Sequence, residues 1–203
     1  MRKIVVLAFI SLDGVMQAPG GPEEDPSGEF KHGGWVFPLS DDFTGNIMIG
    51  QMSHDFDLLL GRKTYEIFAS YWPSQDTEKD PIAAAFSKAS KYVVSNSLEK
   101  AEWSDSFIIK GDAPEEIRKL KEKDGPELQV QGSANLIQTL WKHDLVDELW
   151  LKIFPVTLGS GKRLFDGGSI AAGYELIEFK VSPTGVIFAN YKRSGEVKTG
   201  SMG

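Results

Sequence analysis

The chain has 203 residues, 41% of them hydrophobic, so it can bury one sizeable core and we expect a single domain. Its formal net charge of -7 argues against a nonspecific nucleic-acid surface and against an anionic-membrane surface. The absence of cysteine excludes disulfides, thiolate zinc sites and cysteine nucleophiles. No secretory signal is recognisable, and no apolar run is long enough for a membrane span. We therefore expect a cytoplasmic protein that binds neither nucleic acid nor membranes.

The first two thirds of the chain alternate between predicted strands and predicted helices. Residues 4–10 (IVVLAFI) are apolar without alternation, which is typical of a strand buried on both faces of a parallel sheet. Further strands are predicted at residues 56–60, 92–94, 107–109 and 127–133. Helices are predicted at residues 42–53, 65–71, 113–123 and 134–141. This alternation predicts an α/β fold with a doubly wound, mostly parallel sheet.

The last third of the chain has a different pattern. Residues 148–155, 174–182 and 186–193 are typical of longer strands, and the turn sequence Ser-Pro-Thr-Gly lies between the last two. We expect a C-terminal antiparallel hairpin that closes one edge of the sheet. The predicted domain therefore spans residues 1–193, and residues 194–203 form a flexible tail.

Two of these late strands, 148–155 and 186–193, carry apolar residues on both alternating faces. A sheet edge that faces solvent should carry fewer, so we predict a symmetric homodimer built on this region. Helices of the same chain could cover the same residues instead.

Earlier in the chain, the loop at residues 17–34 is long and rich in glycine and proline, and it is either a functional lid or disordered.

Two predicted strands open directly into helices through a glycine. The strand at 127–133 ends in Gly132 and Ser133, directly before the helix that begins at Ala134. Gly61 lies between the strand at 56–60 and the helix that follows it. Free backbone N–H groups and the positive end of a helix dipole favour an anion at such a junction. Two junctions of this kind suggest a dinucleotide, although each could also be a plain tight turn.

Six short stretches occur in an order that resembles a known family. They are residues 11–14 (SLDG), 61–66 (GRKTYE), 94–97 (VSNS), 130–134 (VQGSA), 145–149 (LVDEL) and 155–161 (PVTLGSG). The chain resembles the dihydrofolate reductase-like fold, and most closely its branch related to the reductase domain of the bifunctional riboflavin-biosynthesis deaminase/reductase. Without cysteine, the zinc deaminase half of that enzyme is not present in this chain.

The resemblance implies NADPH as the hydride donor. Arg62 or Lys63 would supply charge toward the ribose 2′-phosphate, and Thr64 would supply a hydroxyl. Three short polar residues after a strand would complete that pocket, and three residues at the second junction would hold the pyrophosphate. These two sets are Ser95, Asn96 and Ser97, and Gly132, Ser133 and Ala134. The alternative for the basic pair is a solvated helix start, and for residues 95–97 it is a turn with a cap.

The resemblance also implies one acid near the start of the helix after the first loop, as the proton source. Asp41 or Asp42 is the nearest equivalent, although Asp41 could instead cap that helix. Asp13 is the other candidate, because it follows the first strand at the rim where ligands bind in open α/β sheets. Asp13-Gly14 is also a common turn pair. The three histidines are scattered, and no metal site is predicted.

The leading prediction is an NADPH-dependent reductase of a small heterocyclic or carbonyl-type substrate. A 5-amino-6-(5-phosphoribosylamino)uracil-like substrate would need basic residues in its pocket, and only Lys162-Arg163 offers such a cluster. A pterin-like substrate is the other possibility. The alternative function is a nonenzymatic nucleotide- or pterin-binding protein on the same scaffold, because one fold hosts many functions.

Overall fold

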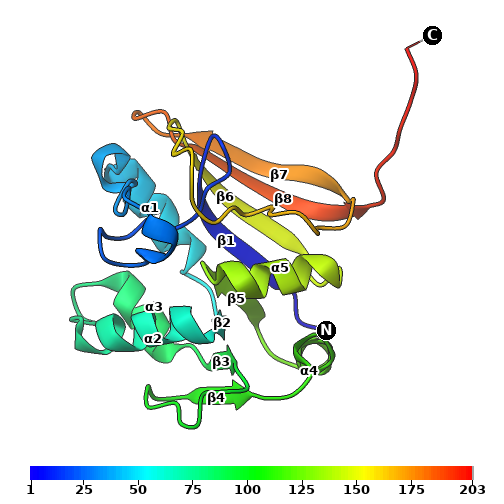
Figure 1. Cartoon of the computed structure of the whole chain (residues 1–203). Helices are drawn as coiled ribbons and strands as arrows, with labels where there is room; N and C mark the ends of the chain where they lie inside the picture. The colour runs from blue at the N-terminus through cyan, green and yellow to red at the C-terminus, as the bar shows by residue number, and fades with distance from the viewer. Residues whose placement is uncertain (203) are drawn as a thin grey trace.

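The computed structural model describes residues 1–202, which form one eight-stranded sheet with helices on both faces (Figure 1). The strands are β1 (Ile4–Ser11), β2 (Phe56–Gly61), β3 (Lys91–Val94), β4 (Ser106–Ile109), β5 (Glu127–Gln131), β6 (Glu148–Phe154), β7 (Gly173–Val181) and β8 (Ile187–Gly195). The α-helices are α1 (Asp42–Gln51), α2 (Arg62–Tyr71), α3 (Pro81–Lys88), α4 (Ala113–Glu122) and α5 (Ala134–Lys142). Three short 3₁₀ turns lie at η1 (Ser27–Glu29), η2 (Phe37–Leu39) and η3 (Trp72–Ser74).

The strand order is β4-β3-β2-β5-β1-β6-β8-β7. All pairs from β4 to β6 are parallel, whereas β8 is antiparallel to both β6 and β7. The predicted mostly parallel sheet with a C-terminal antiparallel hairpin is confirmed. Strand β8 runs to Gly195, two residues into the segment predicted as a tail, and α1 ends at Gln51 rather than at residue 53.

Helix α3 was not predicted from the sequence. Asp80 accepts hydrogen bonds from Ile82 N and Ala83 N, and Pro81 occupies the first turn. An Asp-Pro pair ahead of an alanine-rich segment is a recognisable helix start. The helix is only eight residues long, so its apolar periodicity is short.

The two faces of the sheet are covered differently (Figure 1). On the α5 face, α4 and α5 bury Ile117 and Leu140 against the central strand β1, at Val6. On the opposite face, here called the α1 face, α2 and α3 pack over β2 and β3 around Phe86. Helix α1 and residues 15–39 pack over β6 and β8 around Phe154 on that same face. The α1 face therefore has two separate covers.

Neighbouring strands β2 and β5 are followed by helices on opposite faces. Tyr65 of α2 is buried on the α1 face, and Ile137 of α5 is buried on the α5 face. The chain thus leaves two adjacent strand ends in opposite directions, and this topology predicts a crevice between the loops at the carboxyl edge of the sheet. Ligands of open α/β sheets bind at such a point.

The long loop at residues 17–34 is ordered against the rest of the molecule. Trp35 Nε1 donates to Gln17 O over 2.8 Å, and Gln17 Oε1 accepts Lys162 N over 2.9 Å. Ala18 and Phe30 are buried. Of the two alternatives for this loop, disorder is wrong, because apolar side chains of the loop add to the core. Whether the loop acts as a lid stays a prediction.

Among the helices of residues 1–202, none combines the length and the hydropathy that crossing a membrane requires.

Candidate active site

Two hydrogen bonds join the starts of α2 and α5 across the crevice. Gly61 N donates to Ser133 Oγ over 3.1 Å, and Ser133 N donates to Thr64 Oγ1 over 3.1 Å. The two strand-to-helix junctions that the sequence singled out therefore lie side by side and brace each other.

These two helices begin without a side-chain cap, unlike the other three α-helices. Asp41, Asp80 and Asp112 cap α1, α3 and α4 by accepting hydrogen bonds from the first turn. Gly61 has no side chain to offer α2, and the Ser133 hydroxyl accepts from Gly61 rather than from α5. The first N–H groups of both helices thus remain available for an external acceptor, and both dipoles favour an anion.

The backbone before α5 is held in an unusual conformation. Gly132 has a φ of 66°, and Ser133 has a φ of 52°. Glycine adopts this left-handed region without steric cost, whereas serine does so uncommonly. The two hydrogen bonds to the start of α2 hold Ser133 there. Backbone strain of this kind tends to cluster at ligand sites, and Ala134 then begins α5 at the same place.

The basic pair at the start of α2 lies at the rim of the crevice. Arg62 Nη1 donates to Ser97 Oγ over 2.9 Å, and Arg62 Nε lies 3.4 Å from Glu66 Oε1. Lys63 is exposed. Cations oppose the dipole at a helix start, so their position here is better explained by an anionic ligand than by helix stability.

The three polar residues after β3 have different roles: two stabilise loops, and one lies at the rim of the crevice. Ser95 Oγ accepts from Ser97 N and from Leu98 N, as a turn residue with a cap would. Asn96 exchanges two hydrogen bonds with the backbone of Gly111 and braces the loop after β4. Of the three predicted residues, Ser97 alone contacts the basic pair.

Asp13 anchors a loop at the end of β1. Its carboxylate accepts from Ser11 Oγ over 2.5 Å and from the backbone N–H groups of Leu158 and Gly159 over 3.1 and 2.9 Å. The Ser11 hydrogen bond, followed by the two backbone bonds, lowers the pKa of Asp13 to about 2. An acid that is so strongly held in its ionised form is poorly suited to donate a proton at neutral pH.

Asp41 is the N-cap of α1. Its Oδ1 accepts from Thr44 N over 2.8 Å and from Thr44 Oγ1 over 2.7 Å, and these bonds lower its pKa. Asp42 is exposed in the first turn of the same helix. The capping alternative for Asp41 is confirmed, and neither carboxylate lies on the floor of the crevice.

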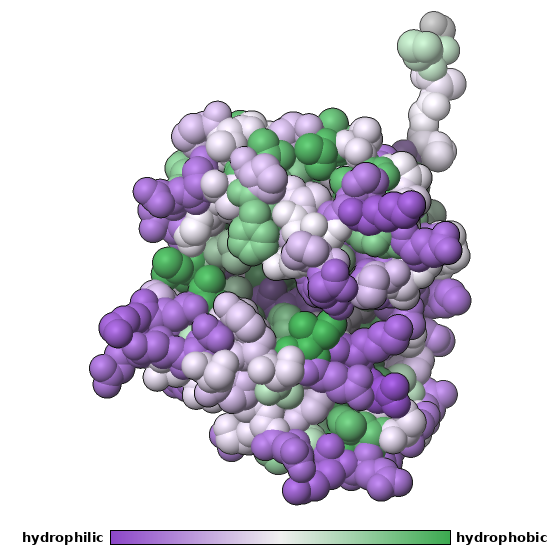
Figure 2. All heavy atoms as spheres, turned by 60° about the vertical axis from the view of Figure 1, so that its left-hand side comes forward, coloured by the Kyte–Doolittle hydropathy of each residue, from purple (hydrophilic) through white to green (hydrophobic). Residues whose placement is uncertain are grey.

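The crevice floor is formed by side chains of the central strands on the α1 face. Phe9 is only half-buried although β1 lies between two other strands. Gln131 at the end of β5 is 9% exposed and donates to Gln129 Oε1 over 3.1 Å. Figure 2 shows this side of the molecule hollowed at mid-height, between its upper and lower parts. The recess lies between the two covers of the α1 face.

Lys152 is beside this floor, and sequence reasoning missed it. It pairs with Phe9 across β1 and β6, is 2% exposed, and its Nζ lies 5.2 Å from the centre of the Phe9 ring. Burial alone lowers the pKa of Lys152 to about 7. A lysine inside the apolar run of β6 (ELWLKIF) was the available signal.

Comparison with known proteins identifies the family. The model of the RibD C-terminal domain matches residues 2–188 of the chain. The chain belongs to this family. It is also similar to the Bacillus subtilis (strain 168) uncharacterized protein YyaP, at 29% identity over 96% of both chains. The Bacillus subtilis uncharacterized protein YwjB is 28% identical over 81% of this chain and 83% of its own length.

Solved structures show the same fold for this RibD C-terminal domain. A protein from Shewanella sp. PV-4 that is named for riboflavin biosynthesis superimposes with a TM-score of 0.70 at 24% identity, covering 95% of this chain and 99% of its own. Dihydrofolate reductase from Enterococcus faecalis, in complex with NADP(H) and RAB-propyl, superimposes with a TM-score of 0.59 at 14% identity, covering 94% of this chain and 96% of its own. The dihydrofolate reductase-like fold predicted from the sequence is therefore confirmed.

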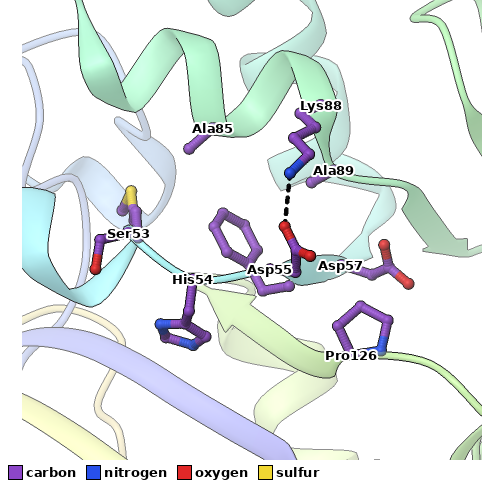
Figure 3. Close-up of a pocket in the computed structure, with 10 residues that line it drawn as sticks. Ser53, His54, Asp55, Asp57, Ala85, Lys88, Ala89 and Pro126 are labelled. Carbon is purple, nitrogen blue, oxygen red and sulfur yellow. Dashed lines mark hydrogen bonds and ion pairs between the residues drawn. The ribbon is translucent and has the colours of Figure 1, made fainter.

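Two further cavities of this RibD C-terminal domain lie away from the helix starts. One, of about 380 Å³, lies at the amino end of β2, where His54 and Pro126 line it and Lys88 Nζ contacts Asp55 Oδ1 over 2.6 Å (Figure 3). The other, of about 540 Å³, lies between α1 and strands β6 to β8 and includes Trp150. Within residues 1–202, no cluster of three His, Asp or Glu side chains could hold a metal ion.

Proposed function

We propose that this RibD C-terminal domain is an NADPH-dependent reductase that transfers a hydride to a small heterocyclic substrate. The observation that carries the proposal is the pair of uncapped, cross-linked helix starts at the carboxyl edge of the sheet. A dinucleotide carries phosphates at more than one place, and two adjacent helix starts can take more than one. The Enterococcus faecalis dihydrofolate reductase, which holds NADP(H), shares this fold.

Each part of this site has a defined role in the proposal. The N–H groups that begin α5 at Ala134 would hold the pyrophosphate, and Gly132 lets the backbone approach it closely. Thr64 and Ser133 fix the two helices in place. Arg62, held by Ser97, and the exposed Lys63 would contact the ribose 2′-phosphate.

NADPH supplies the hydride when it is bound. The protein would then orient the substrate over Phe9 and exclude water from the recess between the two covers of the α1 face. Hydride transfer to a C=N or C=O bond also needs a proton at the nitrogen or oxygen atom.

The second basic cluster, Lys162-Arg163, bears on the class of substrate. Lys162 Nζ forms an ion pair with Asp25, and Arg163 donates to Asp13 O and lies 3.6 Å from its carboxylate. Both cations are occupied in anchoring loops. A substrate without a phosphate, such as a pterin-like heterocycle, therefore fits this chain better than a phosphoribosyl compound.

The experiment is a fluorescence titration with NADPH and with NADH, followed by turnover assays with pterins, flavins and aminopyrimidines. Saturable NADPH binding with substrate-dependent oxidation of NADPH supports the reductase. Saturable binding without oxidation across the panel favours the alternative, a nonenzymatic nucleotide- or pterin-binding protein. Absence of NADPH binding overturns the reductase and the nucleotide-binding alternative, and leaves the pterin-binding one.

A further inference from the structure

Lys152 occupies an unusual position for a charged side chain. It lies near the carboxyl end of β6, between Phe9 of β1 and Phe188 of β8. It is 2% exposed, yet no hydrogen bond and no neighbouring charge contributes to its pKa, for which burial is the only cause. A buried lysine without a counterion destabilises the fold, so the presence of Lys152 carries a free-energy cost.

The amine of Lys152 is not sealed inside the protein. Within residues 1–202, the side-chain polar atoms that are both fully enclosed and without a partner are Gln51 Oε1 and Ser106 Oγ. The Lys152 amine is not one of them and has no hydrogen-bond partner, so the nitrogen keeps some exposure. Its nearest aromatic neighbour, Phe9, is half-buried at the floor of the recess. The amine therefore lies at the edge of the recess.

The sheet register places Lys152 level with the helix-start site. Leu7 pairs with Gln131, the last residue of β5, so Phe9 is level with the turn at Gly132 and Ser133. Lys152 pairs with Phe9 and is two strands from that turn, about 10 Å at the usual strand spacing. Phe9 and Lys152 therefore lie on the two strands next to the helix starts that would hold the phosphates of a dinucleotide.

We propose that Lys152 donates the proton that completes the reduction. The proposal rests on the reductase function proposed above and deepens it. The hydride adds to the carbon of a C=N or C=O bond, and the nitrogen or oxygen takes a proton from Lys152 Nζ. The ammonium becomes an amine, which takes a proton from water, and NADPH leaves as NADP⁺. The substrate class is therefore one whose reducible double bond ends in nitrogen or oxygen.

The charged groups on the neighbouring strands and on α1 do not compete with Lys152 for this role. On β6, Glu148 is engaged by Lys3, and on β1 no charged residue follows Lys3 before the strand ends. On β8, the residues opposite and two further on are Phe188 and Asn190. On α1, the acids are the cap Asp41 and the exposed Asp42.

Chemistry also favours Lys152 over the carboxylates. A proton donor works best when its pKa lies near the operating pH. Burial brings the pKa of Lys152 to about 7, whereas the hydrogen bonds of Asp13 lower its pKa to about 2. Water is the alternative donor, and it would not produce a titration near pH 7.

The test is the pH dependence of kcat and kcat/KM for the wild type and for Lys152→Met, with a substrate taken from the panel above. The matched control is Lys91→Met, which removes another buried lysine, one whose Nζ lies 4.3 Å from the Trp103 ring centre, outside the crevice. In the wild type and the control, the rate should fall as the pH rises through about 7. In Lys152→Met, kcat should fall by about 100-fold or more, and the decrease in rate near pH 7 should disappear from its pH profile. The Kd for NADPH should stay within about twofold of the wild-type value.

Each result has a distinct meaning. A Lys152→Met enzyme that keeps the wild-type rate and the decrease near pH 7 overturns the donor role and leaves the reductase function standing. Loss of this decrease in both lysine variants overturns the donor role as well, because the effect would then be structural. Tight NADPH binding by the wild type with no turnover of any substrate overturns the reductase function itself.

Discussion

The backbone N–H of Ser133 donates a hydrogen bond to the hydroxyl of Thr64 over 3.1 Å, although 69 positions separate them in the chain. Helices α2 and α5 lie on opposite faces of the sheet, and this bond fixes their starts to each other. The return bond from Gly61 N to Ser133 Oγ makes the link reciprocal. A site built from two rigid helix starts is preorganised, so little ordering is needed when a ligand binds.

Removing the Thr64 hydroxyl should therefore weaken both the fold and the site. Thr64→Val keeps the side-chain shape but leaves the part-buried Ser133 N–H without its partner, which costs about 1–3 kcal/mol of unfolding free energy. The Kd for NADPH should rise together with the loss of stability. Thr139→Val is the control, because the Thr139 hydroxyl donates only to Asn135 O on the exposed side of α5. Urea unfolding and NADPH titration measure the two effects. Equal behaviour of the two variants would contradict the bracing role.

Cofactor preference should depend on the basic pair at the start of α2. Replacing both Arg62 and Lys63 with Ala should weaken NADPH binding by about 1–3 kcal/mol, the scale of hydrogen bonds to charged groups, and leave NADH nearly unchanged. Lys88→Ala is the control, because Lys88 pairs with Asp55 at the amino end of β2. Fluorescence titrations measure the six dissociation constants, for three proteins with two cofactors each. Similar losses for NADPH and NADH would rule out a 2′-phosphate contact.

The sequence predicted the parts of the site that depend on local order along the chain. A glycine between an apolar strand and a helix marks a junction wherever it occurs, so Gly61 and Gly132 could be found directly. Their contact through Ser133 and Thr64 could not, because it depends on which strands are neighbours. Lys152 was missed for a related reason. A single lysine in an apolar strand resembles an edge residue until the register shows Phe9 and Phe188 on either side.

Asp13 should act as a structural anchor that depends on its charge. Asp13→Asn keeps one acceptor but cannot satisfy the Ser11 hydroxyl and the N–H groups of Leu158 and Gly159 as well, so the variant should be less stable at pH 7. The folded pKa is about 2, below the unfolded value of 3.8, so this stabilisation is present above about pH 4 and is lost as the pH falls toward 2. The difference in unfolding free energy between wild type and variant should therefore shrink over that range. Urea unfolding at pH 7 and at pH 3 measures it, and a constant difference would contradict the anchor.

Self-association through the C-terminal sheet region stays a prediction. The structure shifts the expected interface from β6 to β7 and β8. Leu151 and Phe154 of β6, on which the expectation was partly based, are buried within the chain. The exposed apolar residues lie on the edge strand β7 and its neighbour β8: Leu176, Ile177, Phe179, Val181 and Ile187. An edge strand with this composition is a ready surface for a second copy.

Light scattering at micromolar concentration should therefore give the mass of a dimer. Phe179 of β7 is 65% exposed, so Phe179→Asp places a charge on this surface, and it should give a monomer with unchanged far-UV circular dichroism. Phe107→Asp is the control, since Phe107 is also exposed but lies on β4 at the other edge of the sheet. A monomeric wild type, or dissociation by the control alone, would rule out this interface.

The buried amine of Lys152 should make stability depend on pH in a recognisable way. Its folded pKa is about 7, and its unfolded pKa is near 10.5. Below pH 7 both states carry the charge, and the folded state bears the full cost of desolvating it. Between pH 7 and about 10 the unfolded chain holds one more proton than the folded chain, so the wild type gains stability as the pH rises. Lys152→Met lacks this gain in stability with rising pH.

The Met variant should therefore be more stable than the wild type at pH 6, and its advantage should shrink by about 2–3 kcal/mol by pH 9, the free energy equivalent of two pH units. Urea unfolding of both proteins at the two pH values measures the difference, in which other titrating groups cancel. Lys180→Met is the control, because Lys180 is exposed and pairs with Glu178, so its removal should have the same small effect at both pH values. An advantage of Lys152→Met that does not change with pH would mean that the Lys152 amine keeps an ordinary pKa, and a donor that titrates near pH 7 would then have to be a different group.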